Sequence, residues 1–258
     1  MIPKLTFLGT GTSQGVPVIG CKCTVCKSTN PKDNRLRTSA YVEYMGLRVL
    51  IDAGPDFRQQ LLRAHIDNVD AILLTHEHKD HTAGLDDVRA FNYINKRAID
   101  IYAEERVQRA IKQEFSYAFA KDRVPGVPEF ALHTIDEQPF QIGQAVITPL
   151  RVWHAKLPIL GFRIADLAYI TDANRIDDTE LDKLTGLSVL VMNAVRRKPH
   201  ISHYHLQEAI DVAQRINAKQ TYLTHISHQM GLYNDVEKEL PAGIALAYDT
   251  LEITSGQK

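Results

Sequence analysis

The chain has 258 residues, of which 44% are apolar and 24% are charged. These proportions are those of an ordinary globular protein and exclude a disordered tail protein or a repeat array. Lysine and arginine total 30 against 31 aspartate and glutamate residues, so the formal net charge is −1. This balance argues against nucleic-acid binding by bulk charge. At roughly 100–200 residues per domain, the length allows one large domain or two small ones.

No apolar run approaches the ~20 residues that a membrane-spanning helix needs. The segment from Met1 to Leu8 lacks the long apolar core of a signal peptide and instead predicts a first strand. We therefore expect a cytoplasmic protein without a membrane partner.

Period-two alternation predicts strands along most of the chain, and 3.6-residue periodicity predicts fewer helices between them. No linker-like segment or internal repeat interrupts this order, so we expect one α/β domain over residues 1–258, with helices outside two packed sheets. The predicted strands are Leu5–Leu8, Ser39–Tyr44, Leu47–Ile51, Val69–Leu74, Ile99–Ala103, Phe130–Thr134, Pro139–Ile142, Ala145–Trp153, Gly161–Ile164, Ala168–Thr171, Ser188–Met192, Thr221–Thr224 and Ile244–Ile253. The predicted helices are Asp56–Ala64, Gly84–Asn95, Glu104–Phe119, Asp177–Leu184 and Leu206–Ile216.

All three cysteines, Cys21, Cys23 and Cys26, lie in one short stretch. An odd and tightly clustered set is a poor disulfide framework, but three thiolates can supply three of the four ligands of a tetrahedral zinc ion. His228, which follows His225 by three residues, is the candidate for the fourth ligand. The alternative interpretation is three small buried apolar side chains.

A second cluster, with the pattern HxHxDH, directly follows the predicted strand Val69–Leu74. His76 and His78 are two residues apart and would lie on the same side of an extended segment, whereas Asp80 and His81 can turn back from the loop. Imidazole and carboxylate groups suit Zn²⁺, Mn²⁺ or Fe²⁺. The cluster therefore predicts a metal site, and two nearby ions could share hydrolytic work.

The cluster His76–His81 resembles the signature of the metallo-β-lactamase superfamily of metallohydrolases. Further motifs of that family match in order along nearly the whole chain: Asp52 after a strand, then His154, Asp172 and His225. The resemblance implies an α/β protein with a four-layer αββα sandwich and a dinuclear metal-dependent hydrolase. It implies that one ion is held by His76, His78 and His154 and a second by Asp80, His81 and His225, with Asp172 bridging them and Asp52 orienting the site. Taken alone, His154 could be an ordinary core or surface histidine, and Asp52 and Asp172 could be turn residues.

Two further segments, Gly9–Cys26 and Leu223–Gln229, resemble the PhnP-type phosphodiesterases within this superfamily. That family hydrolyses phosphoribosyl cyclic phosphates. The resemblance implies one structural zinc ion held by Cys21, Cys23, Cys26 and His228, beside two catalytic divalent metals. Manganese, zinc and iron all suit the ligand types of the catalytic pair.

Three histidines precede the predicted helix Leu206–Ile216, and His203 matches the position of the family's general acid. A histidine near its reference pKa of ~6.5 suits proton donation at neutral pH. His200 and His205 are alternatives, and all three could instead cap the helix in solvent. We assign catalytic roles to His203 and to Asp80.

The expected function is hydrolysis of small phosphodiesters, cyclic ribosyl phosphates among them, by a hydroxide that bridges the two metals. The alternatives are a tRNA 3′-processing nuclease, a thioesterase on the same dinuclear site, and a noncatalytic metal-binding module. The net charge argues against the nuclease. A homodimer agrees with the resemblance. Residues 90–128 match no family motif and could form a cap, with Arg89, Asn92 and Tyr93 as lining residues or as exposed helix decoration.

Overall fold

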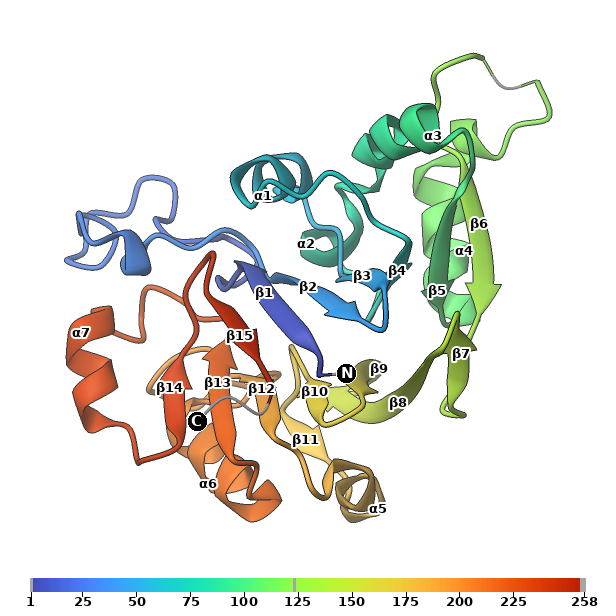
Figure 1. Ribbon diagram of the computed structural model, residues 1–258. Helices are drawn as coiled ribbons and strands as arrows, with labels where there is room; N and C mark the ends of the chain where they lie inside the picture. The colour runs from blue at the N-terminus through green and yellow to red at the C-terminus, as the bar shows by residue number, and fades with distance from the viewer. Residues whose placement is uncertain (1, 123, 256–258) are drawn as a thin grey trace.

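The computed structural model describes residues 2–122 and 124–255, which form two packed β-sheets with helices on both outer faces (Figure 1). The first sheet has the strand order β15-β1-β2-β3-β4-β5-β6. Its strands are β1 (Lys4–Gly9), β2 (Ser39–Tyr44), β3 (Leu47–Ile51), β4 (Ala71–Leu73), β5 (Ile99–Ala103), β6 (Phe130–Thr134) and β15 (Glu252–Thr254).

The second sheet has the order β11-β8-β9-β10-β12-β13-β14, and β7 also pairs with β8. Its strands are β7 (Phe140–Ile142), β8 (Ala145–His154), β9 (Leu157–Ile164), β10 (Leu167–Tyr169), β11 (Arg175–Ile176), β12 (Val189–Asn193), β13 (Gln220–Thr224) and β14 (Ile244–Leu246).

Helices flank the sheets on their outer sides (Figure 1). Among the described residues, none of them is long and apolar enough to cross a bilayer. The α-helices are α1 (Phe57–Arg63), α2 (Lys79–Thr82), α3 (Arg89–Asn95), α4 (Glu105–Glu114), α5 (Asp178–Leu181), α6 (Leu206–Ile216) and α7 (Tyr233–Val236). The short 3₁₀ helices are η1 (Pro31–Asp33), η2 (Leu85–Val88), η3 (Ser116–Ala118), η4 (Asp182–Leu184) and η5 (Glu237–Glu239).

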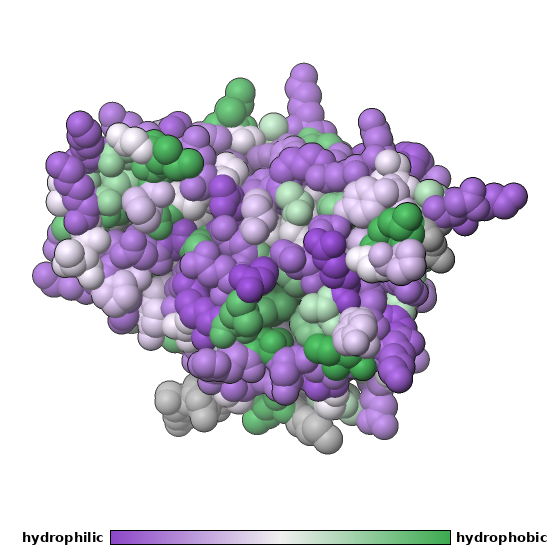
Figure 2. Space-filling model, turned by 90° about the horizontal axis from the view of Figure 1, so that it is seen from above, coloured by the Kyte–Doolittle hydropathy of each residue, from purple (hydrophilic) through white to green (hydrophobic). Residues whose placement is uncertain are grey.

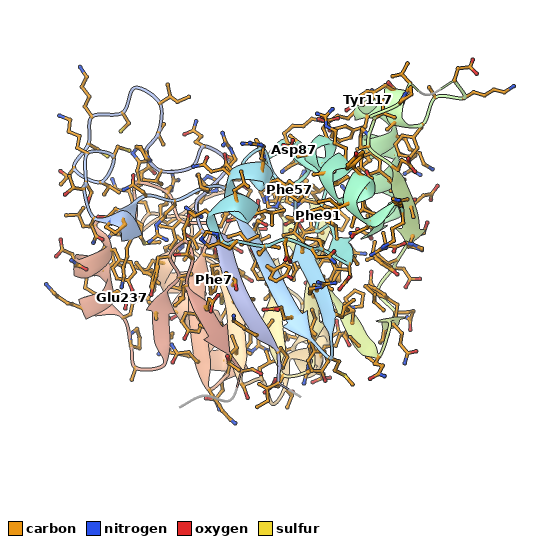
Figure 3. All side chains as sticks on the ribbon, turned by 45° about the horizontal axis from the view of Figure 1, so that its top comes forward. Phe7, Phe57, Asp87, Phe91, Tyr117 and Glu237 are labelled. Carbon is orange, nitrogen blue, oxygen red and sulfur yellow. The ribbon has the colours of Figure 1, made fainter. Side chains whose placement is uncertain are left out.

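Three separate apolar clusters define four layers. The inner cluster lies between the sheets and contains Phe7 and Tyr169, both fully buried. A second cluster lies between the first sheet and its helices, where the rings of Phe57 and Phe91 pack nearly perpendicular with centroids 6.4 Å apart (Figure 3). The third joins the apolar face of α6 to the second sheet. The predicted αββα sandwich is thereby confirmed.

Strand direction places the functional end of the sandwich. The strands β3, β4, β5 and β6 are parallel to one another, and so are β10, β12, β13 and β14. β8 runs with β10 because both are antiparallel to β9. Asp52 and the predicted ligands lie at or after the carboxyl ends of β3, β4, β8, β10 and β13, so the sheets present them together at one end of the sandwich.

One predicted element is wrong. The segment Ile244–Ile253 is not one strand but two, because β14 belongs to the second sheet and β15 to the first. Between them, the buried carboxylate of Asp249 accepts hydrogen bonds from the Thr10 hydroxyl and the Leu36 backbone N–H and pairs with Arg63. These long-range contacts hold the crossing between the sheets, and local strand propensity cannot reveal them.

The face in Figure 2 is mainly hydrophilic, with several small and separate apolar patches. Large exposed apolar side chains include Ile19, Tyr93, Val124 and Ile201, which belong to distant parts of the sequence. Single exposed apolar residues of this kind are normal on a globular protein.

Candidate metal-dependent active site

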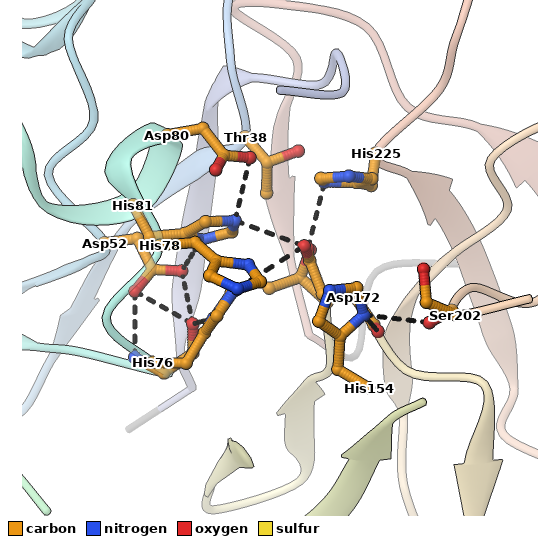
Figure 4. A network of polar contacts seen from close by, with 12 residues as sticks. Thr38, Asp52, His76, His78, Asp80, His81, His154, Asp172, Ser202 and His225 are labelled. Carbon is orange, nitrogen blue, oxygen red and sulfur yellow. Dashed lines mark hydrogen bonds and ion pairs between the residues drawn. The ribbon is translucent and has the colours of Figure 1, made fainter. Parts of the chain in front are cut away.

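The ends of five strands position the predicted ligand residues (Figure 4). Asp52 directly follows β3, and His225 directly follows β13. Asp52, Asp172 and His225 have φ angles of 62°, 60° and 55°, in the left-handed region that few non-glycine residues adopt. This conformation ends each strand abruptly and turns the chain at the edge of the site. His76 follows β4, and His154 is the last residue of β8.

The side chains form two groups with ligand atoms no more than 4.8 Å apart. Asp172 lies between them: its carboxylate oxygens are 3.8 Å from Nε2 of His76, 3.3 Å from Nε2 of His81 and 3.0 Å from Nδ1 of His225. The first group is His76, His78 and His154, and the second is Asp80, His81, Asp172 and His225. The structure therefore brings together all seven residues that the sequence proposed as ligands.

The second nitrogen of three of these histidines is held by a neighbour. Asp52 accepts a hydrogen bond of 2.7 Å from Nδ1 of His81, and Nδ1 of His76 lies 2.9 Å from the Thr75 hydroxyl. Nδ1 of His154 lies 2.9 Å from the backbone carbonyls of Asp172 and Ser202. Such bonds set the tautomer and orientation of a ligating imidazole, and leave Nε2 of each ring for a metal ion.

Some buried nitrogen atoms in this cluster have no hydrogen-bond partner among the described residues. They are Nε2 of His76 and Nδ1 of His203. Nε2 of His81 and Nδ1 of His225 have only carboxylate contacts, at 3.3 Å and 3.0 Å from Asp172. A buried polar atom without a partner costs free energy, so such atoms indicate that something else binds there. Imidazole nitrogens and carboxylates converging on one point are the donor set of a divalent transition metal. The residues therefore fit the ions that the family implies.

Burial and charge fix the protonation states that suit this role. Burial lowers the pKa of His76 well below its ordinary value and keeps that ring neutral. Burial alone would raise the pKa of Asp172, but the neighbouring His225 and His81 hold it well below its usual range. These two groups therefore have the forms that bind metals, neutral imidazole and ionised carboxylate. His81 differs: burial lowers its pKa, but Asp172, Asp52 and Asp80 outweigh burial and raise the pKa well above its ordinary value.

Asp52 is fully buried and does not reach the centre of the cluster. Besides His81, its carboxylate accepts hydrogen bonds from the backbone N–H of Thr75 at 2.9 Å and from the Thr75 hydroxyl at 2.9 Å and 3.1 Å. Its hydrogen bond with Nδ1 of His81 is the contact expected of a residue that orients a metal ligand. The backbone is closely packed near Asp52: a Cβ on Gly54 would lie 2.0 Å from the carbonyl oxygen of Asp80, so only glycine fits at this position.

The three cysteines and His228 form a further group, apart from the two groups of histidine and aspartate ligands. The sulfur atoms of Cys21 and Cys23 lie 3.3 Å and 3.4 Å from Nδ1 of His228, and the ligand atoms of all four residues are within 4.8 Å of one another. A hydrogen bond from the backbone N–H of Cys26 and the nearby His228 lower the pKa of the Cys23 thiol to about 6. A thiolate of this kind suits zinc, whereas burial raises the pKa of the Cys26 thiol to about 11.

His203 lies over the edge of the cluster. Its ring centroid is 4.6 Å from that of His154 and 4.9 Å from that of His225. Burial and the nearby His225 lower the pKa of His203 to about 3, below the ordinary value expected from the sequence. A bound anion would oppose this shift, because negative charge stabilises the imidazolium ion.

The two alternative histidines occupy different places. The ring of His200 is 4.9 Å from that of His203 and lines the same hollow. His205 is the N-cap of α6, and its Nδ1 lies 2.6 Å from the carboxylate of Glu208. His205 therefore has the helix-capping role that the sequence also allowed.

The described residues of the segment 90–128 include strand β5 of the first sheet, most of α3, and α4 and η3, whose apolar side chains pack in the cluster on the outer side of that sheet. Arg89, Asn92 and Tyr93 line a hollow there, but none of the proposed metal ligands lines it. The amide of Asn92 bonds the carbonyls of Arg97 and Glu129, and the Tyr93 side chain is 87% exposed. Arg89 and Tyr93 therefore fit the interpretation as exposed helix surface, whereas Asn92 is buried and holds the backbone of neighbouring segments, a role that neither interpretation predicted.

Sequence reasoning missed the supporting residues of the site. Thr75 directly precedes the HxHxDH motif, but nothing in its local pattern shows that it connects Asp52 to His76. The carbonyl of Ser202 reaches His154 across 48 positions. Such contacts depend on the tertiary fold, although a hydroxyl residue directly before a ligand cluster is a usable signal.

Comparison with known proteins agrees with this geometry. Residues 47–226, more than half of the chain, match the family described as Beta-lactamase superfamily domain. The chain is 42% identical over 258 residues to an octanoyltransferase of Porphyromonas gingivalis, but it spans only about half of that relative, 99% of this chain against 52% of the other. It is also 26% identical to a ribonuclease Z of Pyrobaculum islandicum, over 87% of this chain and 86% of that protein.

Among solved structures, a diphosphatase from the PhnP family is 42% identical and superimposes with a TM-score of 0.92, covering 98% of this chain and 97% of the other. The zinc-bound PqqB of Methylobacterium extorquens, 19% identical, superimposes with a TM-score of 0.76 over 97% of this chain and 99% of that one, and shows the fold. The chain therefore belongs to the metallo-β-lactamase superfamily and is a PhnP-like hydrolase of that fold.

Proposed function

We propose that the chain is a metal-dependent phosphodiesterase that acts on small phosphodiesters, cyclic ribosyl phosphates among them. The observation that carries this proposal is the convergence of buried imidazole nitrogens on the carboxylate of Asp172, with Nε2 of His76 and Nδ1 of His203 left without a hydrogen bond. The similarity to a PhnP-family diphosphatase supports a phosphorus centre as the target.

We further propose two catalytic divalent ions and one structural zinc ion. The first catalytic ion would be held by His76, His78 and His154, and the second by Asp80, His81 and His225, with Asp172 shared. When bound, divalent ions lower the pKa of water to about 7 and offset negative charge on phosphoryl oxygens. The thiolates of Cys21, Cys23 and Cys26 with His228 suit zinc.

The chain's own residues then bind and orient the substrate and move a proton. Asp52 holds Nδ1–H of His81, so that Nε2 of that ring faces the centre. His203 borders both the cluster and the hollow beside it, where the leaving group of a diester would lie. The negative charge of the phosphodiester raises the pKa of His203, and the imidazolium donates its proton to the departing oxygen.

A second candidate is hydrolysis of a diphosphate. The 42% identical solved structure is described as a diphosphatase, and the same ligand set would suit attack at a phosphoanhydride. A phosphate leaving group needs less protonation than an alkoxide, so this reaction depends less on His203.

Because ribonuclease Z proteins are among the relatives, the experiment must also test whether the chain cleaves a tRNA precursor. We do not propose octanoyl transfer, because that relative is about twice as long as the matched chain.

One preparation, loaded with manganese, tests these classes side by side. The substrates are bis(p-nitrophenyl) phosphate, a nucleoside diphosphate, an acyl thioester and a tRNA precursor. We expect turnover of the diester above that of the thioester and the tRNA precursor. Turnover confined to the thioester or to the tRNA precursor would contradict the proposal.

A further inference from the structure

Two charged side chains of the HxHxDH motif belong to neither group of metal ligands. Glu77 lies between His76 and His78, and Lys79 lies between His78 and Asp80. A residue at either position is covalently joined to a ligand on each side. Whatever holds its side chain therefore also restricts the ligands next to it.

Both of these side chains contact helix α4. Glu77 pairs with Arg106 in the first turn of α4, and Lys79 pairs with Glu114, the last residue of the helix. The side chains of Arg106 and Glu77 are 29% and 25% exposed, whereas that of Lys79 is 67% exposed. Because water screens an exposed ion pair, the pair of Glu77 and Arg106 is the stronger of the two contacts.

Arg106 also contacts the second sheet. Its Nη1 donates a hydrogen bond to the carboxylate of Glu77, and its Nη2 donates one of 2.7 Å to the backbone carbonyl of Pro158. Pro158 lies in β9, and its partner in β8 is Trp153, directly before His154. One guanidinium group therefore connects the ligand segment that follows β4 to the β8–β9 hairpin.

Neighbouring contacts join the same parts of the molecule. The carboxylate of Glu104, directly before α4, lies 3.6 Å from Nη2 of Arg106 and accepts a hydrogen bond of 2.5 Å from Arg151 in β8. The backbone N–H of Leu160 in β9 donates to the carbonyl of Thr75 at 3.1 Å. Since these contacts remain when the Arg106 side chain is shortened, we expect such a variant to fold.

The contacts of Arg106 concern one of the two ligand groups. His76, His78 and His154 form that group, and they come from different sheets. Within the described part of the chain, the polar contacts of the Arg106 side chain are with Glu77, Glu104 and Pro158. None of these three is adjacent to a ligand of the second group.

We propose that Arg106 is a positioning residue for the ion held by His76, His78 and His154. It acts through Glu77 on the first two histidines and through the β8–β9 hairpin on the third, and so fixes the distance between them. Fixed ligands bind a metal ion more tightly because less order has to be imposed when the ion arrives. The inference rests on the proposed function and adds to it a residue outside both ligand groups that supports one catalytic ion.

Manganese binding, followed by electron paramagnetic resonance, tests this role. Arg106→Met removes the guanidinium but keeps most of the apolar stem. We expect two ions per unaltered chain at the histidine groups. In Arg106→Met one ion should keep its affinity and the other should bind about tenfold more weakly, the lower end of the cost of removing a group that supports a ligand. Arg109→Met is the matched control, because Arg109 lies in the same helix and pairs there with Glu105.

Two ligand variants identify the ion that is retained. His154→Ala loses a ligand of the first group, and His225→Ala loses one of the second. At one manganese ion per chain, the spectrum of Arg106→Met should match that of His154→Ala. A match to His225→Ala, or equal weakening of both ions, would overturn the proposal, since a general loss of folded structure would affect both groups.

Glu77→Gln tests the same contact from the ligand segment and does not depend on the folding of Arg106→Met. It should weaken the same ion. The loss in the double variant of Arg106→Met and Glu77→Gln should be smaller than the product of the two single losses, because both changes remove one shared contact. Losses that multiply would show that the two residues act independently and would contradict the proposal.

Bis(p-nitrophenyl) phosphate separates failure of this inference from failure of the proposed function. If the unaltered protein binds two ions and hydrolyses the diester while Arg106→Met binds both ions as Arg109→Met does, the inference is wrong and the proposed function stands. If two ions bind but no phosphorus ester is hydrolysed, the proposed function fails and the binding data alone decide the role of Arg106. If the histidine groups bind no metal, both fail.

Discussion

Replacing Asp52 by asparagine tests how the site is oriented. Both carboxylate oxygens act only as acceptors: Oδ1 receives the backbone N–H and hydroxyl of Thr75, and Oδ2 receives the Thr75 hydroxyl and Nδ1–H of His81. An amide has a single acceptor oxygen. In either orientation, Asp52→Asn therefore turns an NH₂ group toward a donor and also removes the negative charge beside His81.

Two losses follow from this geometry. Partners that orient a metal-bound histidine are worth about 10- to 100-fold in metal affinity, or roughly 1.4–2.8 kcal/mol. An unsatisfied buried donor costs about 1–3 kcal/mol of folding free energy. We expect weaker metal binding and a lower free energy of unfolding, with the fold retained.

Competition with a chromophoric chelator measures the metal affinity, and urea unfolding of the same samples measures stability. Asp67→Asn is the matched control, since it makes the same change at an exposed position of the chain. A metal affinity of Asp52→Asn within twofold of the control would refute the orienting role. Circular dichroism before titration checks that both variants are folded.

Three further substitutions test the proton donor, the cysteine cluster and a surface ion pair. His203→Ala should slow hydrolysis of alkyl diesters by about 10²- to 10⁴-fold but that of nitrophenyl diesters far less, because nitrophenolate leaves without a proton; equal slowing would count against proton donation. Cys23→Ser should release zinc in metal analysis and lower the unfolding midpoint by about 2–4 °C for each kcal/mol lost, while a zinc content equal to that of the unaltered chain would exclude the cysteine site. Burial raises the pKa of Asp70, but hydrogen bonds with Arg48 outweigh burial and lower this pKa below its ordinary value. The pair therefore stabilises the folded state at pH values above the unfolded-state pKa of Asp70. This stabilisation is lost as the pH falls through the folded-state pKa. Arg48→Met should therefore cost about 1 kcal/mol at pH 7 in urea unfolding and nothing in strong acid; a cost independent of pH would refute the ion pair's contribution.

Much of the fold could be predicted because the periodic patterns are strong. The strands Ser39–Tyr44 and Leu47–Ile51 and the helix Leu206–Ile216 have the predicted bounds. Their apolar residues face clear cores, so local pattern and tertiary burial agree. The segment Ile244–Ile253 was mispredicted because its division between two sheets depends on contacts of Asp249 with distant residues.

The candidate ligands were predictable because each follows a recognisable strand within a motif. The hydrogen bonds that orient these ligands could not be predicted from the sequence. Thr75 and the carbonyl of Ser202 act through tertiary contacts. Likewise, the low pKa of His203 results from burial against His225, which sequence spacing does not reveal.

We propose that the clustered histidines and Asp172 form a metal-dependent phosphodiesterase site. Hydrolysis of bis(p-nitrophenyl) phosphate by the manganese-loaded protein, with His76→Ala on the same plate, tests it most directly. His65→Asn serves as the control, because His65 is exposed, lies outside the ligand groups and has a positive φ that asparagine tolerates. We expect turnover by the unaltered protein and by His65→Asn, and loss of turnover in His76→Ala. Equal turnover in His76→Ala, or none in a protein with its metals confirmed bound, would contradict it.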